Sequence, residues 1–235
     1  MPFKDIDCTK CLTRPSSCFK LLSEDELRLI NKSKIITLYK KGQNIFYEGR
    51  MPSGLYCLKS GKVKIAKTGL DGKEQIVRFV IPGGLLGIRA FIADRNYMAN
   101  STALEDSVVC FFDKQTFNKI TEKNPDISRC LLATLSKLLG EAEERITSLA
   151  QKPVRERLAE TLLLLNTVYK TKGQWDINPI IRLSREDLAN IVGTATETII
   201  RLLKNFKDEE LISIDGRNIL LGDIEGLKRI AYFGD

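Results

Sequence analysis

Short alternating runs of apolar and polar residues fill the first half of the chain, over residues 35–113. Glycine, proline and Asp-Gly signals separate these runs, and Asp71-Gly72 lies between two of them as a hairpin turn would. Many short strands with glycine-marked turns are typical of an antiparallel β-roll or sandwich. A helix is predicted ahead of the strands at residues 21–31, with Ser23 as its N-cap and Glu26 completing a capping box.

Beyond residue 125 the apolar positions recur with the helical period, which predicts one long helix over residues 125–152. A helix of this length between two domains seldom finds enough surface in its own subunit to cover its apolar stripe. The stripe therefore predicts a homodimer joined by a parallel coiled coil. The alternative is that the stripe packs on the chain's own first domain. The apolar residues expected in the dimer seam are Leu131, Leu135, Leu138, Leu139, Ala142, Ile146 and Leu149.

Pro153 interrupts the helical pattern and is expected to mark a domain boundary. After it the sequence predicts a helix at residues 155–169, a loop at 172–174 and a short strand at 180–183. The expected organisation has four parts. These are a cysteine-containing segment at 1–20, a β-roll sensor domain at 21–124, a dimerisation helix at 125–152 and a DNA-binding domain at 153–235.

Residues 184–203 predict two short helices joined by a tight turn, which is the helix-turn-helix pattern. Ser184 is placed to cap the first helix, and Gly193 can adopt the left-handed conformation that the turn requires. Thr194 is expected to cap the second helix, with Glu197 closing a second capping box. The chain is therefore expected to bind double-stranded DNA.

The second helix of such a module places its first residues in the major groove. Glu197 can accept a hydrogen bond from cytosine N4, Arg201 can donate to guanine O6 and N7, and Ile200 can contact a thymine methyl group. The alternatives are that Glu197 only caps the helix and that Arg201 is a solvated charge. A hairpin with an Asp215-Gly216 turn follows, which makes the module winged. The expected DNA-contacting residues are Thr194, Thr196, Glu197, Ile200, Arg201, Lys204 and Arg217.

The net charge of +7 does not by itself indicate nucleic-acid binding, because residues 149–235 hold 13 basic and 13 acidic residues. The chain has no histidine, which excludes Ser-His-Asp and Cys-His catalysis. Neither a P-loop nor a nucleotide-binding fingerprint occurs, so an enzyme is not expected. No apolar run approaches a membrane span and the N-terminus, residues 1–5, has no apolar signal stretch, so the sequence predicts a soluble cytoplasmic protein with no membrane partner.

Six cysteines provide the remaining chemistry. Cys8, Cys11 and Cys18 precede the first helix with two and six residues between them, and Cys110 lies in a predicted strand. In a cytosolic chain this spacing indicates metal or redox chemistry more than structural disulfides. Structural zinc and a redox-switched disulfide among free thiols are both open alternatives. The other two cysteines, Cys57 in a strand and Cys130 on the long helix, are expected to be packing residues.

The order of β-roll, long helix and winged module resembles the family of the cyclic-AMP receptor protein and the fumarate–nitrate reduction regulator. The most specific match is TETIIRLL, at residues 196–203, which resembles the recognition helix of that family, E-T-[IV]-x-R-[IL]-L. GLYCLKSGKVKI and IPGGLLG resemble the strand and turn motifs of its roll. The resemblance implies a homodimer that binds a near-palindromic operator. Ile200 replaces a small residue of the family pattern.

The resemblance also implies RNA polymerase as a partner, through a hairpin tip that corresponds to residues 68–75. Here Lys73 replaces an acidic residue of that tip, so whether the chain activates transcription is open. The resemblance further places Glu144 in the dimer seam, where it would repel its symmetry mate. The alternative is that Glu144 is a solvated carboxylate.

Cyclic-nucleotide binders of the family hold their ligand with a Gly-Glu and an Arg-Ser pair. The corresponding residues here are Gly87-Ile88 and Tyr97-Met98, and neither Arg89 nor Arg95 lies in the expected register. An unpaired buried phosphate charge would cost several kcal/mol. The sequence therefore argues against cAMP as the effector.

The cysteine arrangement resembles the oxygen-sensing branch of the family, in which three N-terminal cysteines and one from the roll hold a [4Fe–4S] cluster. That resemblance implies Cys8, Cys11, Cys18 and Cys110 as ligands. It also implies DNA binding that oxygen or nitric oxide abolishes. The alternative class of sensor binds a small organic effector or haem in the roll.

Overall fold

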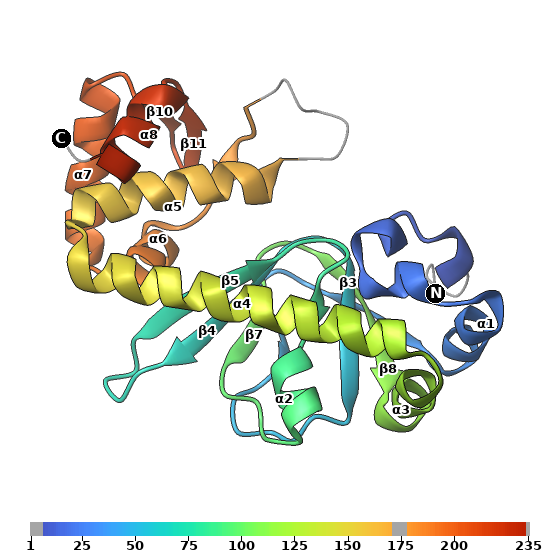
Figure 1. Ribbon diagram of the computed structural model, residues 1–235. Coiled ribbons are helices and arrows are strands. Elements are labelled where there is room, and N and C mark those ends of the chain that lie inside the picture. Colours follow the sequence, from blue (N-terminus) through green and yellow to red (C-terminus); the bar gives the residue numbers. More distant parts are fainter. Residues whose placement is uncertain (1–6, 171–177, 234–235) are drawn as a thin grey trace. The chain divides into compact units, whose positions relative to one another are not determined.

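The computed structural model describes residues 7–170 and 178–233 (Figure 1). The loop expected at 172–174 and the first six residues of the expected cysteine segment lie outside the described residues. The contacts divide the chain into two compact units. Unit 1 comprises Met1–Gly72 and Val77–Glu141, and unit 2 comprises Lys73–Ile76 and Ala142–Asp235.

Unit 1 begins with three short 3₁₀ helices, Cys8–Lys10, Arg14–Ser16 and Cys18–Leu21, and continues with helix α1, Glu24–Ser33. The Ser23 hydroxyl accepts from the Glu26 backbone N–H, and the Glu26 carboxylate accepts from the Ser23 backbone N–H. This pair satisfies two of the backbone donors that a helix start leaves free. The predicted capping box is confirmed.

The strands of unit 1 form two four-stranded antiparallel sheets, with orders β1-β8-β3-β6 and β2-β7-β4-β5. The predicted antiparallel β-roll and α+β fold class are confirmed. Gly72, in the turn between β4 and β5, has a φ of 79°, as the predicted hairpin requires. The strands are β1 Ile35–Tyr39, β2 Asn44–Phe46, β3 Gly54–Ser60, β4 Val63–Thr68, β5 Glu74–Val80, β6 Leu85–Leu86, β7 Asn100–Ala103 and β8 Ser107–Asp113.

Two apolar cores lie on opposite faces of the β1-β8-β3-β6 sheet. One fills the roll between the two sheets and includes Leu58, Val63 and Val109. The other joins the outer face of that sheet to the N-terminal segment and the surrounding helices. Alternation along β8 explains the division, because Val109 faces the first core and Cys110 the second.

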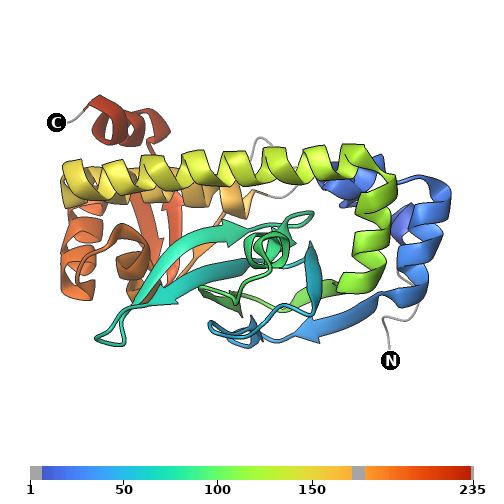
Figure 2. The same cartoon turned by 60° about the horizontal axis from the view of Figure 1, so that its bottom comes forward.

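Helices α2, Ile88–Ala93, and α3, Lys114–Lys123, precede the long helix α4, Pro125–Gln151. Figure 2 shows α4 as one unbroken helix. The next helix, α5, starts at Val154 directly after Pro153, so the break expected at that proline is present. Proline has no backbone N–H and its ring clashes with the preceding turn of a helix, which explains the interruption.

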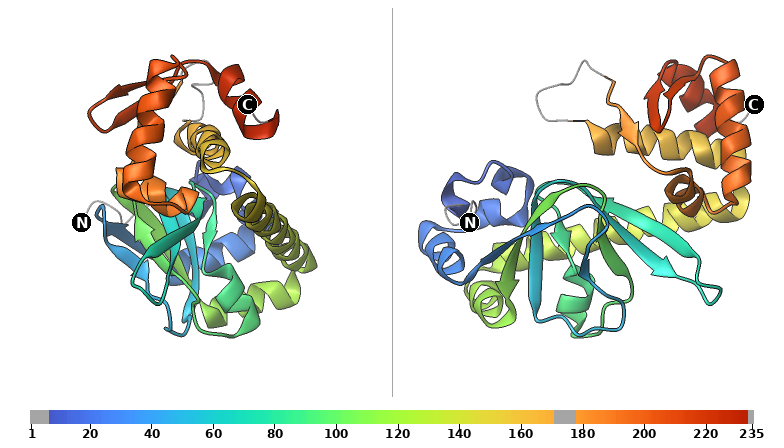
Figure 3. Two further views of the ribbon diagram at one scale, coloured as in Figure 1. Left: turned by 90° about the vertical axis from the view of Figure 1, so that its left-hand side faces the viewer. Right: turned by 180° about the vertical axis from the view of Figure 1, so that it is seen from behind.

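Unit 2 contains the predicted winged helix-turn-helix. Its elements are α5 Val154–Tyr169, β9 Ile181–Arg182, α6 Arg185–Val192, α7 Thr196–Asp208, β10 Ile212–Asp215, β11 Asn218–Leu221 and α8 Ile224–Phe233. The β10–β11 hairpin and β9 form a small antiparallel sheet, and Figure 3 shows the hairpin beside the orange α7.

Candidate DNA interface and cysteine site

Helix α7 has one apolar face that is buried and one polar face that is exposed. Ile199, Leu202, Leu203 and Phe206 are buried in unit 2. The other side presents Glu197, Ile200, Arg201 and Lys204, all exposed. Of the residues expected to lie away from the apolar stripe, Glu197, Ile200 and Arg201 are exposed and Thr196 is partly exposed. Ile200, 54% exposed, is an apolar side chain among charged ones.

The turn before α7 differs from the expectation in one respect. Gly193 has the predicted left-handed backbone, with a φ of 72°. The N-cap of α7 is Ala195 rather than Thr194, and no side-chain cap bond to α7 occurs in the part of the chain that the structure describes. The expected Thr194 capping box is therefore wrong, because α7 starts one residue later than the pattern placed it. Glu197 is thus free of a capping role.

Two arginines fix the helix-turn-helix by binding the last carbonyls of α6. Arg145 donates to the Ile191 carbonyl at 2.6 Å, and Arg157 donates to the Val192 carbonyl at 2.9 Å and the Gly193 carbonyl at 3.3 Å. The final carbonyls of a helix have no partner within it and bear its partial negative charge. Burial lowers the pKa of Arg145. The sequence reasoning missed both residues; the only signal was a basic residue on each of two amphipathic helices.

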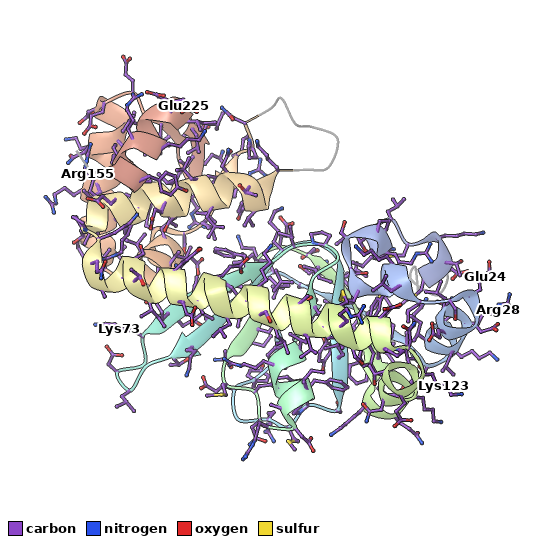
Figure 4. All side chains as sticks on the ribbon, viewed as in Figure 1. Glu24, Arg28, Lys73, Lys123, Arg155 and Glu225 are labelled. Carbon is purple, nitrogen blue, oxygen red and sulfur yellow. A yellow bond between two sulfur atoms is a disulfide. The ribbon has the colours of Figure 1, made fainter. Side chains whose placement is uncertain are left out.

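A second set of contacts orients the far end of α7. Arg155 of α5, labelled in Figure 4, donates to both carboxylate oxygens of Glu209 at 3.0 and 2.7 Å. Its guanidinium also lies 4.9 Å from the centroid of the Phe206 ring. The bidentate pair lowers the pKa of Glu209 through its hydrogen bonds to Arg155. Arginine contacts thus hold the end of α6 before the turn and the far end of α7.

The wing presents Arg217 at its tip. Asp215 pairs with Asn218, and Gly216 has a φ of 56°, so the two-residue loop consists of Gly216 and Arg217, one position later than the predicted Asp215-Gly216 turn. Arg217 is exposed, and Arg185 at the start of α6 donates to the Gly216 carbonyl at 3.2 Å. The wing turn is thereby tied to the helix-turn-helix.

Helix α4 divides its apolar residues between two faces. Leu131 is only 2% exposed and packs in the core of unit 1, against which Leu135 and Leu138 also pack in part. On the other side Leu132, Leu139 and Ile146 are 63%, 61% and 65% exposed. They are spaced seven residues apart, and each is followed three residues later by Leu135, Ala142 or Leu149, which is the a/d pattern of a coiled coil.

This register differs from the expected seam at two positions, Leu131 and Glu144. Leu131 is buried in the core of its own unit, so it is not available to a second chain, whereas Leu138 is only partly buried there, as Leu135 is. Glu144 follows Ala142 by two residues, about 200° around the helix, so it points away from the exposed row. Leu132, which the sequence reasoning omitted, belongs to that row. We call Leu132, Leu135, Leu139, Ala142, Ile146 and Leu149 the α4 row.

Three of the expected metal ligands are free thiols in unit 1. Cys8 and Cys110 are buried in the same core, and Cys11 is partly exposed. The Lys34 ammonium donates to the Cys8 sulfur at 3.5 Å. Burial, followed by the nearby Cys8 thiol, raises the pKa of Cys110 to about 11. Cys57 lies directly opposite Cys110 in the β3–β8 ladder and faces the same core, so a fourth thiol adjoins these three.

Cys18, the remaining expected ligand, forms a disulfide with Cys130 of α4. The expectation that Cys130 only packs is wrong, and a disulfide within the N-terminal cysteines is not what the structure contains. Sulfur atoms gather beside the N-terminal half of α4 in Figure 4. A sulfur in a disulfide is not a thiolate, which iron–sulfur clusters require. With Cys18 so bonded, the four expected residues do not fit a four-cysteine cluster. Among the described residues no group of three cysteine or acidic side chains has metal-site geometry.

Aromatic packing occupies the roll around Gly87 and Tyr97, two of the residues considered above for cAMP binding. The Tyr97 ring stacks on Phe46 with centroids 3.9 Å apart, and a Cβ at Gly87 would lie 2.8 Å from the Tyr97 ring. Ile88 is buried in the core outside the roll, where a glutamate would have no charged partner. Arg89 is exposed. Ile88 and Tyr97 are thus buried packing residues, and neither carries a charge that could pair with a phosphate.

Both units match family models. Residues 36–124 match the cyclic nucleotide-binding domain, and residues 156–230 match the Crp-like helix-turn-helix domain. No helix in the described residues is long and apolar enough to cross a membrane.

Similar proteins cover nearly the whole chain. The fumarate and nitrate reduction regulatory protein of Vibrio cholerae serotype O1 is 30% identical, over 92% of this chain and 86% of its own length. The cyclic AMP receptor protein of Thermus thermophilus is 26% identical, over 92% of this chain and 97% of its own. The structure of FixK2 from Bradyrhizobium japonicum matches with a TM-score of 0.73 and 24% identity, covering 83% of this chain and 96% of that one.

The relatives are transcription regulators and not enzymes. The exposed polar face of α7, the wing and the two family models agree with one another. The chain belongs to the Crp/Fnr family and is a DNA-binding transcriptional regulator of that family.

Proposed function

We propose that this regulator reads a near-palindromic operator as a homodimer, with Glu197, Ile200 and Arg201 contacting bases and Lys204, Thr194, Thr196 and Arg217 contacting the backbone. The observation that supports this assignment is the exposed face of α7, whose opposite face is fully buried. An arginine fork and a carboxylate on one exposed helix face match guanine and cytosine edges in the major groove. Lys204 lies one turn further along, where a cation meets phosphate.

The dimer is proposed to form through the α4 row. Exposed leucine and isoleucine side chains at heptad spacing leave apolar area in water that a second α4 would cover. A two-fold dimer presents its two recognition helices to successive major grooves, about 34 Å apart. RNA polymerase is the proposed further partner, and the exposed Leu70 at the tip between β4 and β5 is the surface that favours it.

Selection from random duplexes tests the DNA assignment. Two half-sites with two-fold symmetry are expected. Arg201→Ala should weaken binding to the selected site by about 5- to 150-fold and relax one base position in each half-site. Lys204→Ala is the matched control. It should weaken binding to all DNA sequences alike and reduce the salt dependence of the binding constant by about one released ion. Uniform weakening by Arg201→Ala would assign Arg201 to phosphate instead.

The sensory input is proposed to be cysteine chemistry at the N-terminal segment. Fumarate and nitrate reduction regulators occur among the similar proteins, and Cys8, Cys11 and Cys110 are free thiols next to one core. In the reduced chain Cys18 joins them, and these four are the proposed ligands of an oxygen- or nitric-oxide-labile [4Fe–4S] cluster. The apolar packing around Tyr97 supports an effector other than cAMP.

Iron and acid-labile sulfide in protein purified without oxygen test the cluster. About four of each per chain are expected. Cys110→Ser should abolish iron binding, and Cys57→Ser, which changes the residue opposite Cys110, should retain it. Protein that lacks both iron and sulfide throughout anaerobic preparation contradicts the cluster, and stoichiometric zinc supports a structural metal instead.

A further inference from the structure

The Cys18–Cys130 bond joins two segments that are 112 residues apart in the sequence. Cys18 begins the 3₁₀ helix Cys18–Leu21 in the N-terminal segment, and Cys130 lies in the second turn of α4. Their Cα atoms are 5.8 Å apart, within the normal range for a disulfide. The two neighbouring sulfurs on the sheet, Cys57 and Cys110, remain thiols.

We propose that Cys18 and Cys130 form a reversible thiol–disulfide site, which closes when a hydroperoxide oxidises the pair. Closed, the bond holds the N-terminal segment on α4 and takes Cys18 out of the proposed ligand set. Open, it releases Cys18 for that set. The reversible disulfide is inferred from the geometry of the two cysteines alone. The competition for Cys18 as a metal ligand rests on the proposed cluster.

The burial of the two sulfurs assigns their roles in the oxidation. Cys18 is 5% exposed, whereas Cys130 is partly exposed and is the residue that an oxidant in solution can reach. The Cys130 thiolate attacks the peroxide O–O bond and becomes a sulfenic acid, with release of water or an alcohol. The Cys18 thiolate then attacks the Cys130 sulfur and expels hydroxide, which leaves as water. Two thiols and one hydroperoxide thus give one disulfide.

Thr134 holds the pair together from one turn further along α4. Its hydroxyl donates to the Cys130 carbonyl at 2.8 Å, and its oxygen lies 3.7 Å from the Cys18 sulfur. In the reduced chain we expect the Cys18 S–H to donate to this oxygen, since the Thr134 hydrogen is engaged by the Cys130 carbonyl. The Cys18 thiol therefore stays next to Cys130 when the bond opens, and closure requires no rearrangement of α4.

The site lies where the N-terminal segment can influence the proposed dimer. Cys130 directly precedes Leu131, which is buried in the core, and Leu132, the first residue of the α4 row. A covalent bond at Cys130 fixes the first turns of α4 on unit 1. Because one sulfur cannot be both a disulfide partner and a thiolate ligand, oxidation of the pair and metal binding by Cys18 exclude each other.

Peptide mapping of the full-length protein tests the bond. Reduced protein is treated with hydrogen peroxide, alkylated and digested with trypsin without reductant. A linked pair of peptides, residues 11–20 and 130–137, is expected, and fragmentation should place the link on Cys18 and not Cys11. Dithiothreitol should separate the pair, Cys130→Ala should lack it, and the matched Cys57→Ala should keep it. The melting temperature should rise on oxidation by about 10 °C in wild type and Cys57→Ala, but not in Cys130→Ala.

Iron uptake under anaerobic conditions separates this site from the cluster. Disulfide-bonded wild type should take up several-fold less iron than reduced wild type. The Cys130→Ala variant is treated with peroxide and then with a mild reductant of sulfenic acids. It should take up as much iron as reduced wild type. A linked peptide with no iron uptake by any form supports the disulfide and contradicts the cluster. Full iron uptake with no linked peptide after peroxide, or a link from Cys11, overturns the inference.

Discussion

Helices α4 and α7 are both amphipathic, yet their exposed faces differ in chemistry. Each buries one apolar face in its own unit, through Leu131 in α4 and Phe206 in α7. The exposed face of α7 presents charges such as Arg201, whereas that of α4 presents Leu139 and Ile146. Charged groups favour a phosphate-rich partner, and exposed aliphatic groups favour another apolar surface. The uncovered face of each helix therefore indicates the class of its partner.

The largest effect is expected when a charge enters the α4 row. Leu139→Lys places two ammonium groups against each other in the proposed seam, where neither has a carboxylate partner. Burying such charges costs several kcal/mol, so the dimer dissociation constant should rise by at least about 100-fold. Analytical ultracentrifugation measures this constant, and affinity for a two-half-site operator should fall with it. Circular dichroism should be unchanged, because Leu139 is 61% exposed in the single chain.

Glu144→Lys is the matched control on the same helix. It introduces the same side chain at an exposed position that points away from the α4 row. The dimer constant should stay within about threefold of wild type. A dimer that tolerates Leu139→Lys but dissociates with Glu144→Lys would place the seam on the other side of α4 and restore the repulsion first expected at Glu144.

An intermediate effect is expected from the residue that positions the turn before α7. Arg157→Ala removes the bonds to the Lys152, Val192 and Gly193 carbonyls and leaves the end of α6 with fewer partners. Hydrogen bonds from a charged donor contribute about 1.5–3 kcal/mol, so the free energy of unfolding should fall by about 2–3 kcal/mol. Urea denaturation followed by circular dichroism measures this change.

Arg229→Ala provides the comparison for that loss. Its side chain is 68% exposed, and its ion pair with Asp223 is 3.5 Å long. Exposed pairs contribute little, so this variant should change stability by less than about 0.5 kcal/mol. Equal falls in the free energy of unfolding of Arg157→Ala and Arg229→Ala would mean that the carbonyl contacts of Arg157 contribute no more to stability than an exposed ion pair.

The two helices also differ in how far the sequence determined their faces. In α7 the buried apolar residues recur with the helical period on one face, so the exposed positions of Glu197, Ile200 and Arg201 were predicted correctly although Ile200 is itself apolar. In α4 apolar residues occur on both sides, and periodicity alone cannot tell which of Leu131 and Leu132 is covered by unit 1. That information lies in the sheet and helices packed against α4, which no local pattern contains.

The cysteines show the same limit more strongly. The spacing of Cys8 and Cys11 is local and was interpreted as a ligand pattern, and both are free thiols. The Cys18–Cys130 bond depends on a contact across 112 residues. The sequence offered Cys130 only as one apolar position in a helical stripe. Pairing of this kind follows from the tertiary fold and could not be predicted before it.

The smallest effect concerns the two caps predicted for the helix-turn-helix. The Ser184 hydroxyl accepts from the Asp187 backbone N–H at 2.9 Å, so Ser184→Ala should cost about 1 kcal/mol of stability. Thr194 precedes the N-cap of α7, and Thr194→Ala should change the free energy of unfolding by less than about 0.3 kcal/mol. Urea denaturation of the two variants side by side measures both. A fall of about 1 kcal/mol in the free energy of unfolding of Thr194→Ala would mean that the hydroxyl does cap α7 in solution. The recognition helix would then start one residue earlier, and Glu197 would bind the helix backbone instead of DNA.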